Sequence, residues 1–333
     1  MVPAGQAGLR PHGLLLSAAR HYVIFNPASG RGRGGKRILR YQQLLRDALA
    51  DVTFGETTRP GEEHDLARRA CDDGFDVVVA VGGDGTWSNV ADALVSSGRP
   101  DVALGILPSG TGNDFGRNFG YDPRDPGDAV QVLAGGHTRR VDVGRVDSLS
   151  ASEHDPDRLE ARHFLNLIGF GFDVAVIDGA AGARFLRGEL LYKITALQQL
   201  FRFPGIDVEL EAGAGTQRRG RQLMLTVSNG RFFGGGFPIA PDATVDDGRL
   251  HACLIGDAAP LSRLKLFNLA ERGRHVGADE VEIIDDTAFR LTFPEPPRFE
   301  MDGDVRRSEG EVVEVRSLPG ALAVVAPPEQ AVV

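Results

Sequence analysis

This sequence is poor in several residue types on which common kinds of protein site depend. Only two of its 333 residues are cysteines, Cys71 and Cys253, which excludes a disulfide framework and a zinc site built from several cysteines. The histidines do not have the spacing of zinc ligands either. Of the 37 basic residues only Lys36, Lys193 and Lys265 are lysines, so a phosphate site that depends on lysine has few candidates.

Long apolar runs and a net positive charge are also missing. No apolar stretch approaches the roughly 18 residues of a membrane-spanning helix, so we expect no such helix. The formal net charge of −9 disfavours non-specific electrostatic binding of nucleic acid, and we expect no nucleic-acid partner. The composition is that of a globular protein, and at roughly 150 residues per domain the length predicts about two domains.

Two regions of different pattern divide the chain. Residues 21–142 alternate between apolar runs and segments of helical periodicity, which predicts a nucleotide-binding α/β domain with a parallel sheet covered on both faces. Residues 143–318 contain short apolar runs separated by Gly, Pro and Asp turns, which predicts a largely antiparallel β domain. We expect residues 1–20 to form a disordered leader, and residues 319–333 to form a strand and tail that return to the first domain.

Glycine is the residue in excess, with 43 copies that cluster in short loops. In the most informative loop a valine-rich strand runs into Gly82-Gly-Asp-Gly-Thr86 and then into a helix. Glycines let the backbone approach a ligand closely, and N–H groups at a helix N-terminus bind anions. The Asp84 carboxylate at this point could hold Mg²⁺ or accept a proton. A plain strand–turn–helix would explain one Asp-Gly pair but not the whole loop.

Two further loops follow strands of the same predicted sheet, Asn26–Gly35 and Leu107–Phe115. The first lacks the Gly-Lys-Ser/Thr ending of a P-loop, and alone it could be a flexible connection. The second offers hydroxyl and amide groups, although Asn113 and Asp114 also suit helix capping. Because all three loops lie at the carboxyl ends of strands, their convergence favours a nucleotide-phosphate site over three unrelated turns.

Three segments resemble the signatures of the diacylglycerol kinase catalytic-domain family. They are Asn26–Gly30, Gly82–Val90 and Pro108–Phe115, and the resemblance extends in order over residues 20–327. It implies an N-terminal α/β domain like that of phosphofructokinases and NAD kinases, followed by a C-terminal β-sandwich. It also implies ATP in the cleft, Mg²⁺ as the metal ion, and transfer of the γ-phosphoryl group to a lipid hydroxyl.

The resemblance implies a set of ATP contacts in the first domain. Thr57 opens a Thr-x-x-x-Gly pattern, although the residues after it, Glu62–Asp65, differ from the family's usual pair. The implied contacts are Asn26, Thr57, Gly82, Gly83, Asp84, Gly85, Thr86, Trp87, Ser88 and Thr111.

In the second domain, Ile239–Gly248 resembles the family's structural Mg²⁺ loop. The implied ligands are the Asp247 side chain and the backbone carbonyls of Thr244 and Arg249, and oxygen ligands suit a hard cation. The alternative is an Asp-Asp-Gly hairpin turn, which needs no ion.

Phe299–Asp304 resembles the family's Asp-Gly-Glu motif, in which the first acid lies near Mg²⁺ and the last accepts the proton. Here these acids are Asp302 and Asp304, and the second is one methylene shorter than the usual Glu. Asp84 is the alternative proton acceptor. Without the resemblance, Asp302–Asp304 would be interpreted as a β-turn between strands.

The resemblance therefore predicts a cytoplasmic, ATP-dependent lipid kinase in transient contact with the inner membrane face, with diacylglycerol as the first substrate candidate and phosphatidic acid as product. The alternatives are a kinase for a sphingoid or other lipid, an NAD kinase, or a non-catalytic binder of lipid or nucleotide. Homodimerisation is left open. The candidates for an apolar lipid surface, each of which core packing would also explain, are Phe170, Phe172, Leu190, Leu191, Phe201, Phe203, Phe232, Phe233 and Phe237.

Overall fold

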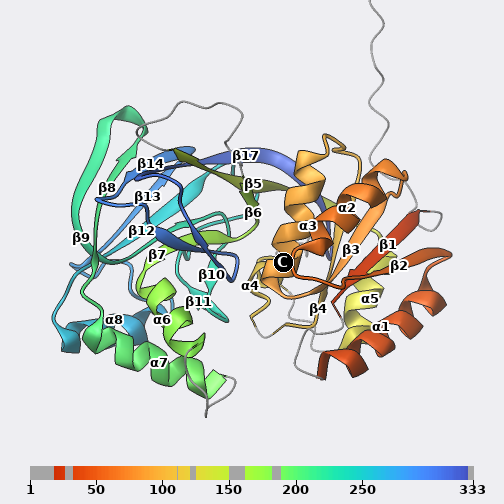
Figure 1. The fold of residues 1–333 in the computed structure, drawn as a ribbon, viewed down its shortest axis with the longest axis horizontal. Helices are drawn as coiled ribbons and strands as arrows, with labels where there is room; N and C mark the ends of the chain where they lie inside the picture. The colour runs from red at the N-terminus through yellow and green to blue at the C-terminus, as the bar shows by residue number, and fades with distance from the viewer. Residues whose placement is uncertain are drawn as a thin grey trace, which may run out of the picture.

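A parallel sheet forms the centre of the first lobe (Figure 1). The computed structural model describes residues 19–26, 33–110, 112–120, 125–149, 162–181 and 189–328. The strands of this lobe lie in the order β2–β1–β3–β4, and all neighbours are parallel. They are β1 (Arg20–Phe25), β2 (Asp51–Glu56), β3 (Val77–Gly82) and β4 (Ala103–Pro108). The helices are α1 (Arg33–Ala48), α2 (Glu62–Asp72), α3 (Asp84–Ser96), α4 (Asp114–Arg117) and α5 (Pro126–Gly135).

Helices cover both faces of this sheet, as the side chains of β3 show. Val78 and Ala80 pack with α2 and α3 on one face. Val77, Val79 and Val81 pack with α1 and α5 on the other face. A strand that is buried on both sides has to be apolar throughout, which is why β3 is a run of valine and alanine. The α/β domain that the sequence predicts is confirmed.

Antiparallel pairs form the second lobe, as predicted. Its strands, apart from β5 and β17, are β6 (Arg162–Phe164), β7 (Leu167–Gly171), β8 (Ile206–Ala212), β9 (Thr216–Ser228), β10 (Phe232–Phe233), β11 (Phe237–Pro238), β12 (Leu250–Gly256), β13 (Val281–Asp286), β14 (Ala288–Thr292), β15 (Arg298–Met301) and β16 (Asp304–Arg307). A short 3₁₀ turn, Gly213–Gly215, links β8 to β9.

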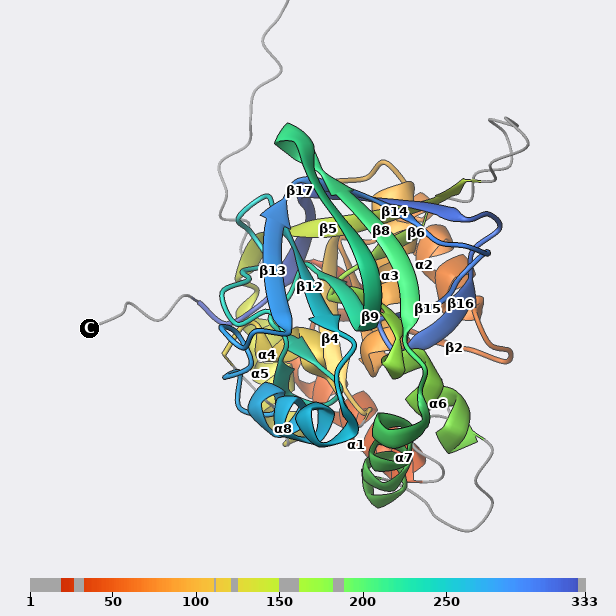
Figure 2. The same ribbon diagram turned by 90° about the vertical axis from the view of Figure 1, so that its left-hand side faces the viewer.

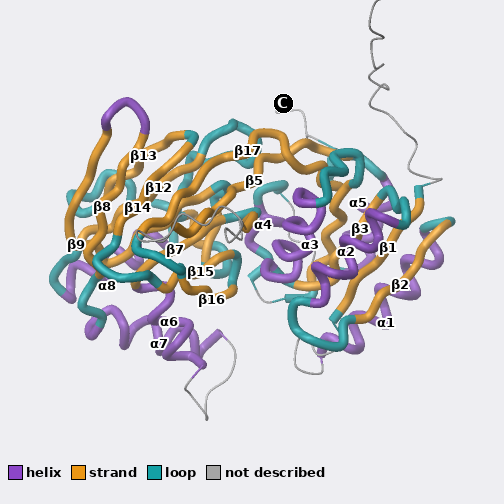
Figure 3. Tube along the Cα trace, turned by 45° about the horizontal axis from the view of Figure 1, so that its top comes forward, coloured by secondary structure: helices purple, strands orange, loops and turns teal. Residues whose placement is uncertain are grey.

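Three helices lie at one end of the second lobe (Figures 2 and 3). They are α6 (Phe172–Ala181), α7 (Glu189–Arg202) and α8 (Pro260–Ala270). Helix α6 has no amphipathic pattern, because Phe172, Val174 and Val176 are all buried, and the sequence did not reveal it. Among the described residues, no helix combines the length and the apolar character that crossing a bilayer requires.

Two long strands, β5 (Thr138–Leu149) and β17 (Val312–Val325), run through both lobes (Figure 1). They pair with each other in antiparallel orientation, and β17 also pairs in parallel with β4 at Ala323 and Val324. The expected domain boundaries after residues 142 and 318 both fall within these strands. The chain therefore passes between the lobes in continuous strands and not in linkers. Of the expected leader, Arg20 is the first residue of β1, whereas residues 1–18, like 329–333 of the tail, lie outside the described chain.

The buried carboxylate of Asp142 stabilises the region where β5 and β17 pass between the lobes. Asp142 is 2% exposed, and its Oδ2 and Oδ1 accept hydrogen bonds from Gly248 N at 2.6 Å and Gly320 N at 2.7 Å. Its own backbone N donates to the Val245 carbonyl at 2.6 Å. One side chain thereby joins the second-lobe loop before β12 to the turn in the middle of β17.

We expect Asp142→Ala to destabilise the protein by about 2–5 kcal/mol, because two N–H groups lose their partner at a buried site. The matched control is Asp246→Ala, which removes a partly exposed ion pair with Arg139 and should cost less than about 1 kcal/mol. Urea unfolding of both variants measures the difference. Equal losses of unfolding free energy in the two variants would show that Asp142 does not stabilise the junction between the lobes.

Candidate active site

The loops with the predicted ATP contacts meet at one edge of the parallel sheet. Asn26 follows β1, Thr57 follows β2 and Gly82–Ser88 spans the end of β3 and the start of α3. Thr57 is buried, and its backbone N donates to the Phe25 carbonyl at 3.0 Å, which holds its loop beside the end of β1. Thr111 lies outside the described residues. Since the four strands are parallel neighbours, the structure brings the described residues together.

The β3–α3 and β4–α4 loops touch through their glycines. Ser109 N and Gly110 N donate to the Gly82 carbonyl at 2.8 and 3.2 Å. A Cβ added at Gly110 would lie only 2.7 Å from the Gly83 Cα, and one added at Gly83 would lie 3.3 Å from the Gly110 Cα. Only glycine permits this approach, so the excess of glycine in these loops has a steric cause. Because Gly82, Gly83 and Gly85 carry no side chains, the backbone at the start of α3 can be approached closely, which suits an anion.

Asp84, the first residue of α3, faces the β4–α4 loop. Its Oδ1 accepts from Phe115 N at 3.0 Å, and a Cβ added at Gly112 would lie 2.9 Å from its Oδ2. Burial raises the pKa of this carboxyl. Carboxylate oxygens are the ligands that a hard cation prefers, so the Asp84 side chain fits the Mg²⁺ that accompanies a nucleotide.

Two other residues of the loop face inward. Trp87 is fully buried and donates from its indole nitrogen to the Ala80 carbonyl at 3.2 Å, so only its backbone is available to a nucleotide. Ser88 is buried as well, and its hydroxyl donates to the His163 carbonyl in the second lobe at 3.5 Å. Thr86 packs against Gly82, because a Cβ added at Gly82 would lie only 2.4 Å from the Thr86 Cβ.

The Asp302–Gly303 turn between β15 and β16 carries the predicted second-lobe acids. The Asp302 carboxylate is buried and accepts from the backbone N atoms of Leu165, Asn166 and Leu167 at 2.7, 3.0 and 3.0 Å. Burial raises the pKa of Asp302 to about 6, against the lowering effect of these hydrogen bonds. Both oxygens are thus engaged by the backbone, so Asp302 anchors the turn in the second lobe.

Asp304 instead lies at the junction between the lobes, with its side chain 53% exposed. A Cβ added at Gly85 would lie 3.4 Å from the Asp304 carboxylate, so this acid faces the N-terminus of α3. Partial burial raises the pKa of Asp304, and Arg306, whose Nη2 lies 4.0 Å away, opposes that effect. The structure therefore brings Asp304 beside Gly85, the next residue after Asp84, although Asp84 and Asp304 are 220 positions apart in the sequence.

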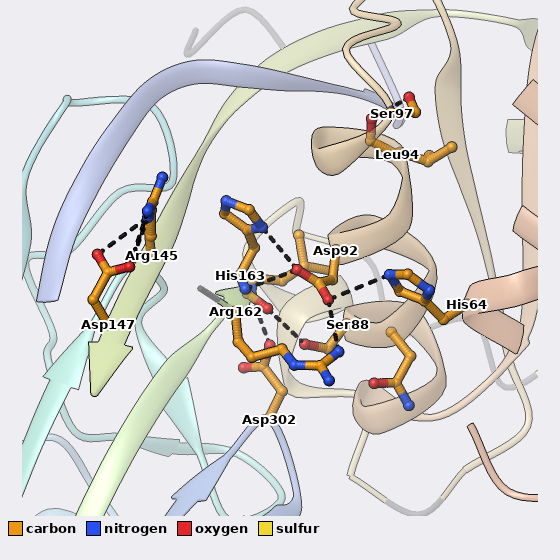
Figure 4. Close-up of polar contacts among 12 residues, drawn as sticks. His64, Ser88, Asp92, Leu94, Ser97, Arg145, Asp147, Arg162, His163 and Asp302 are labelled. Carbon is orange, nitrogen blue, oxygen red and sulfur yellow. Dashed lines mark hydrogen bonds and ion pairs between the residues drawn. The ribbon is translucent and has the colours of Figure 1, made fainter. Parts of the chain in front are cut away.

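A polar cluster beside this turn holds the two lobes in register (Figure 4). Asp92 on α3 accepts from His163 N at 3.0 Å and lies 2.7 Å from its ring Nδ1. Arg162, next to His163 in β6, lies 3.3 Å from the same carboxylate, and His64 of α2 lies 3.6 Å from it. These contacts fix α3 against β6, from which the chain continues to the backbone that binds Asp302.

Asp114 is a site residue that sequence reasoning treated only as a helix cap. Its Oδ2 accepts from Gly235 N of the second lobe at 2.8 Å, and Arg117 Nε lies 3.4 Å from its Oδ1. Burial, followed by the negative charge of Asp84, raises the pKa of Asp114 to about 6. The cap position belongs to Asn113, whose side chain makes no capping hydrogen bond. The sequence feature that could have identified Asp114 as a site residue is the third glycine loop, in which this acid follows Gly112-Asn113.

The loop predicted to bind a structural cation is a hydrogen-bonded turn. Asp247 Oδ1 accepts from Arg249 N at 2.8 Å, and its Oδ2 accepts from the Thr244 hydroxyl at 3.1 Å. His251 Nε2 lies 3.4 Å from the same Oδ2. Within the ranges that the structure describes, no group of three or more His, Cys, Asp or Glu residues is arranged to hold a metal ion. We therefore derive no step from a cation at this loop.

The candidates for a lipid surface separate by burial. Phe170 and Phe172 are buried and belong to the core of the second lobe, so the core-packing alternative holds for them. Phe201 is exposed. Leu190 and Leu191 lie where only the backbone is described. The remaining candidates are half-buried, and these are Phe203, Phe232, Phe233 and Phe237.

Comparison with known proteins identifies the family to which this fold and site belong. Residues 20–146 match the model of the diacylglycerol kinase catalytic domain, and residues 166–326 match that of the YegS C-terminal NAD kinase beta sandwich-like domain. A diacylglycerol kinase of Mycobacterium tuberculosis is 31% identical over 92% of this chain and 94% of its own length. One of Bacillus subtilis is 26% identical over 86% of this chain and 89% of its own.

Solved structures show the same fold. A putative diacylglycerol kinase from Bacillus anthracis superimposes with a TM-score of 0.73 at 19% identity, covering 93% of this chain and 98% of that one. The chain shares with that structure a two-lobe architecture, in which the second domain is β-sandwich-like. The chain belongs to the diacylglycerol kinase family and is an enzyme of the lipid kinase class.

The contact between the two glycine loops can be tested by Gly110→Ala. The added Cβ has to displace the Gly83 backbone, so we expect nucleotide binding to weaken by about tenfold or more, the size of effect that a misplaced binding loop produces. The control is Gly220→Ala on β9, where a Cβ would meet only Gln222 Nε2 at 3.7 Å. Calorimetric titration with an ATP analogue measures both. Unchanged binding by Gly110→Ala would place the nucleotide elsewhere.

Proposed function

We propose that this lipid kinase transfers the γ-phosphoryl group of ATP to the hydroxyl of diacylglycerol and so forms phosphatidic acid. The observation that carries the proposal is the position of Asp304, whose carboxylate faces Gly85 at the N-terminus of α3. A proton acceptor from one lobe therefore lies beside an anion site of the other. The bacterial diacylglycerol kinases among its relatives support this choice of acceptor.

The edge of the parallel sheet supplies the nucleotide site in this proposal. Backbone N–H groups at the start of α3 and in the β4–α4 loop bind the phosphates, and the glycines leave room for them. The Asp84 carboxylate is the residue placed to hold Mg²⁺. When bound, Mg²⁺ screens the charge of the phosphates and of the transition state. The shortage of lysine is consistent with a site that uses backbone groups and a metal ion instead.

The remaining chemistry needs one proton acceptor. The lipid hydroxyl oxygen forms a bond to the γ-phosphorus, the bond from that phosphorus to ADP breaks, and a carboxylate takes the hydroxyl proton. Asp304 is better placed for this role than Asp84, because its side chain is exposed whereas Asp84 is bound to Phe115 N.

We expect Asp304→Asn to lower transfer by about 100-fold or more, the usual contribution of a positioned general base. Asp84→Asn should cause a comparable loss through weaker phosphate neutralisation. The assay follows labelled γ-phosphate from ATP into vesicles that contain diacylglycerol, with NAD in a parallel tube. Asp207→Asn, an exposed acid on β8, is the control and should be unchanged. Wild-type rates in both site variants would overturn the assignment, and label in NAD would overturn the acceptor.

An acceptor that resides in a bilayer requires a surface that meets the membrane, and we place it on the α7–α8 face. Its exposed apolar side chains are Leu197 and Phe201 of α7 and Leu261 of α8, which are 47, 48 and 78% exposed. Among the side chains described in residues 189–202 and 260–274, the exposed basic ones are Arg202, Lys265, Arg272 and Arg274 and the exposed acidic one is Glu271, whereas the whole chain has a net charge of −9. A locally positive, apolar surface complements an anionic membrane.

The double variant Leu197→Ala/Phe201→Ala should sediment about tenfold less well with phosphatidylglycerol-containing vesicles, since each inserted side chain contributes on the order of 1 kcal/mol or more. Its activity on a short-chain diacylglycerol in free solution should stay at the wild-type level. Leu39→Ala is the control, because Leu39 of α1 is 67% exposed but lies on the first lobe. An equal loss in the control would show that the α7–α8 face is not the docking surface.

A further inference from the structure

Two buried acids lie behind the Asp302–Asp304 turn and have no role in the chemistry above. Asp173, near the start of α6, is 1% exposed, and Glu300 of β15 is 4% exposed. Both carboxylate oxygens of Asp173 and the Oε2 of Glu300 lack a hydrogen-bond partner within the described chain. Buried polar atoms without partners are rare in native proteins, so these three atoms call for an explanation.

A glycine lets the two acids face each other. Gly169 of β7 pairs with Glu300 of β15 across the sheet. A Cβ added at Gly169 would lie 1.9 Å from Asp173 Oδ2 and 3.5 Å from Glu300 Oε2. The unpartnered oxygens of both acids therefore flank one point, which any side chain at position 169 would fill.

Glu300 also contacts the turn that carries Asp304. Its second oxygen, Oε1, accepts a hydrogen bond from Gly303 N. The turn has left-handed backbone at both central residues, with φ of 46° at Asp302 and 97° at Gly303. Such a conformation is strained for a residue other than glycine and persists where neighbouring groups hold it. The orientation of the Glu300 carboxyl is thus coupled to the direction in which Asp304 points.

Two adjacent carboxylates cannot both remain charged in a buried site without a cation. The charged groups that act on Glu300 are Asp173, Asp302 and Asp84, all of them acidic. Asp173 lies in the first turn of α6, where the positive end of the helix dipole favours its charged form. Glu300 is then the member that carries the hydrogen, on the oxygen that faces Asp173.

We propose that the protonated carboxyl group of Glu300 donates a hydrogen bond to the Asp173 carboxylate, and that this acid pair positions the turn that carries Asp304. The proposal rests on the proposed function, in which Asp304 accepts the hydroxyl proton. Neither acid touches a reacting atom, so both are positioning residues. The pair acts through Gly303 and leaves the nucleotide loops of the first lobe unaffected.

The substitutions Glu300→Ala and Glu300→Gln test the pair directly. The alanine variant loses both contacts, so kcat should fall by about 10- to 100-fold, the cost of a small misplacement of a reacting group, while KM for ATP stays constant. The glutamine variant keeps an acceptor for Gly303 N and gains a permanent N–H donor toward Asp173, so its kcat should stay close to that of the wild type. Wild-type kcat in Glu300→Ala, or an equal loss in Glu300→Gln, overturns the proposal.

A matched control separates positioning from general destabilisation. Leu225→Ala removes a fully buried side chain on β9, the strand that pairs with β7 on its other side. It should lower the melting temperature at least as much as Glu300→Ala does, yet kcat per folded molecule should be unchanged. If Leu225→Ala lowers kcat as strongly as Glu300→Ala, the turn is not specifically positioned by the acid pair.

The pH dependence of stability tests the pair without reference to any activity. Burial raises the pKa of Asp173 to about 7, and burial and the charge of Asp173 raise that of Glu300 well above its usual range. The folded protein thus keeps protons that the unfolded chain releases near pH 4, and the stability contributed by the pair is lost as the pH rises. Glu300→Gln should make this decline shallower.

Two outcomes of the stability measurement contradict the pair. One is a decline with pH as steep in Glu300→Gln as in the wild type. The other is stabilisation of the wild type, but not of Glu300→Gln, by Mg²⁺ at pH 8, which would put a cation where we place the hydrogen. Because melting is measured without lipid, a failure of diacylglycerol phosphorylation by the wild type would overturn the proposed function and leave this test intact.

Discussion

Three backbone N–H groups bind the Asp302 carboxylate, and the geometry of the whole site depends on this contact. It ties the β15–β16 turn to Leu165–Leu167, the segment that joins β6 to β7. The strand before this segment, β6, is fixed to α3 through His163 and Asp92. One chain of contacts therefore connects the helix whose N-terminus offers an anion site with the turn that presents Asp304. These contacts fix the position of the Asp304 turn relative to the N-terminus of α3.

The two lobes act as one framework because their sheets are continuous. Strands β5 and β17 belong to both lobes, and the Asp142 carboxylate holds the loops where they cross. Kinase chemistry requires two substrates to be aligned without water between them. A junction made of paired strands maintains that alignment better than a flexible linker. The glycine loops complete the framework, since Gly83 and Gly110 pack backbone against backbone.

The features that the sequence predicted are those that short segments determine. The valine-rich run of β3 and its glycine loop indicated a parallel sheet with an anion site at its edge; the structure has the parallel sheet and brings the glycine loops together at that edge. Features that depend on distant parts of the chain could not be predicted from pattern alone. The approach of Asp304 to Gly85, the contact of Asp114 with Gly235, and the pair of Asp173 and Glu300 all join segments far apart in the sequence. The motif Phe299–Asp304 pointed to two acids, and only the fold separates Asp302, which anchors the turn, from the exposed Asp304.

A crystal structure with Mg²⁺ and a non-hydrolysable ATP analogue is the most direct test of the central claim that both lobes build one phosphotransfer site. The account predicts phosphates over the N-terminus of α3, between the loops of Gly83 and Gly110, with the terminal phosphate toward Asp304. A nucleotide bound at the same loops with its terminal phosphate directed away from Asp304, or bound at a different edge of the sheet, would contradict it.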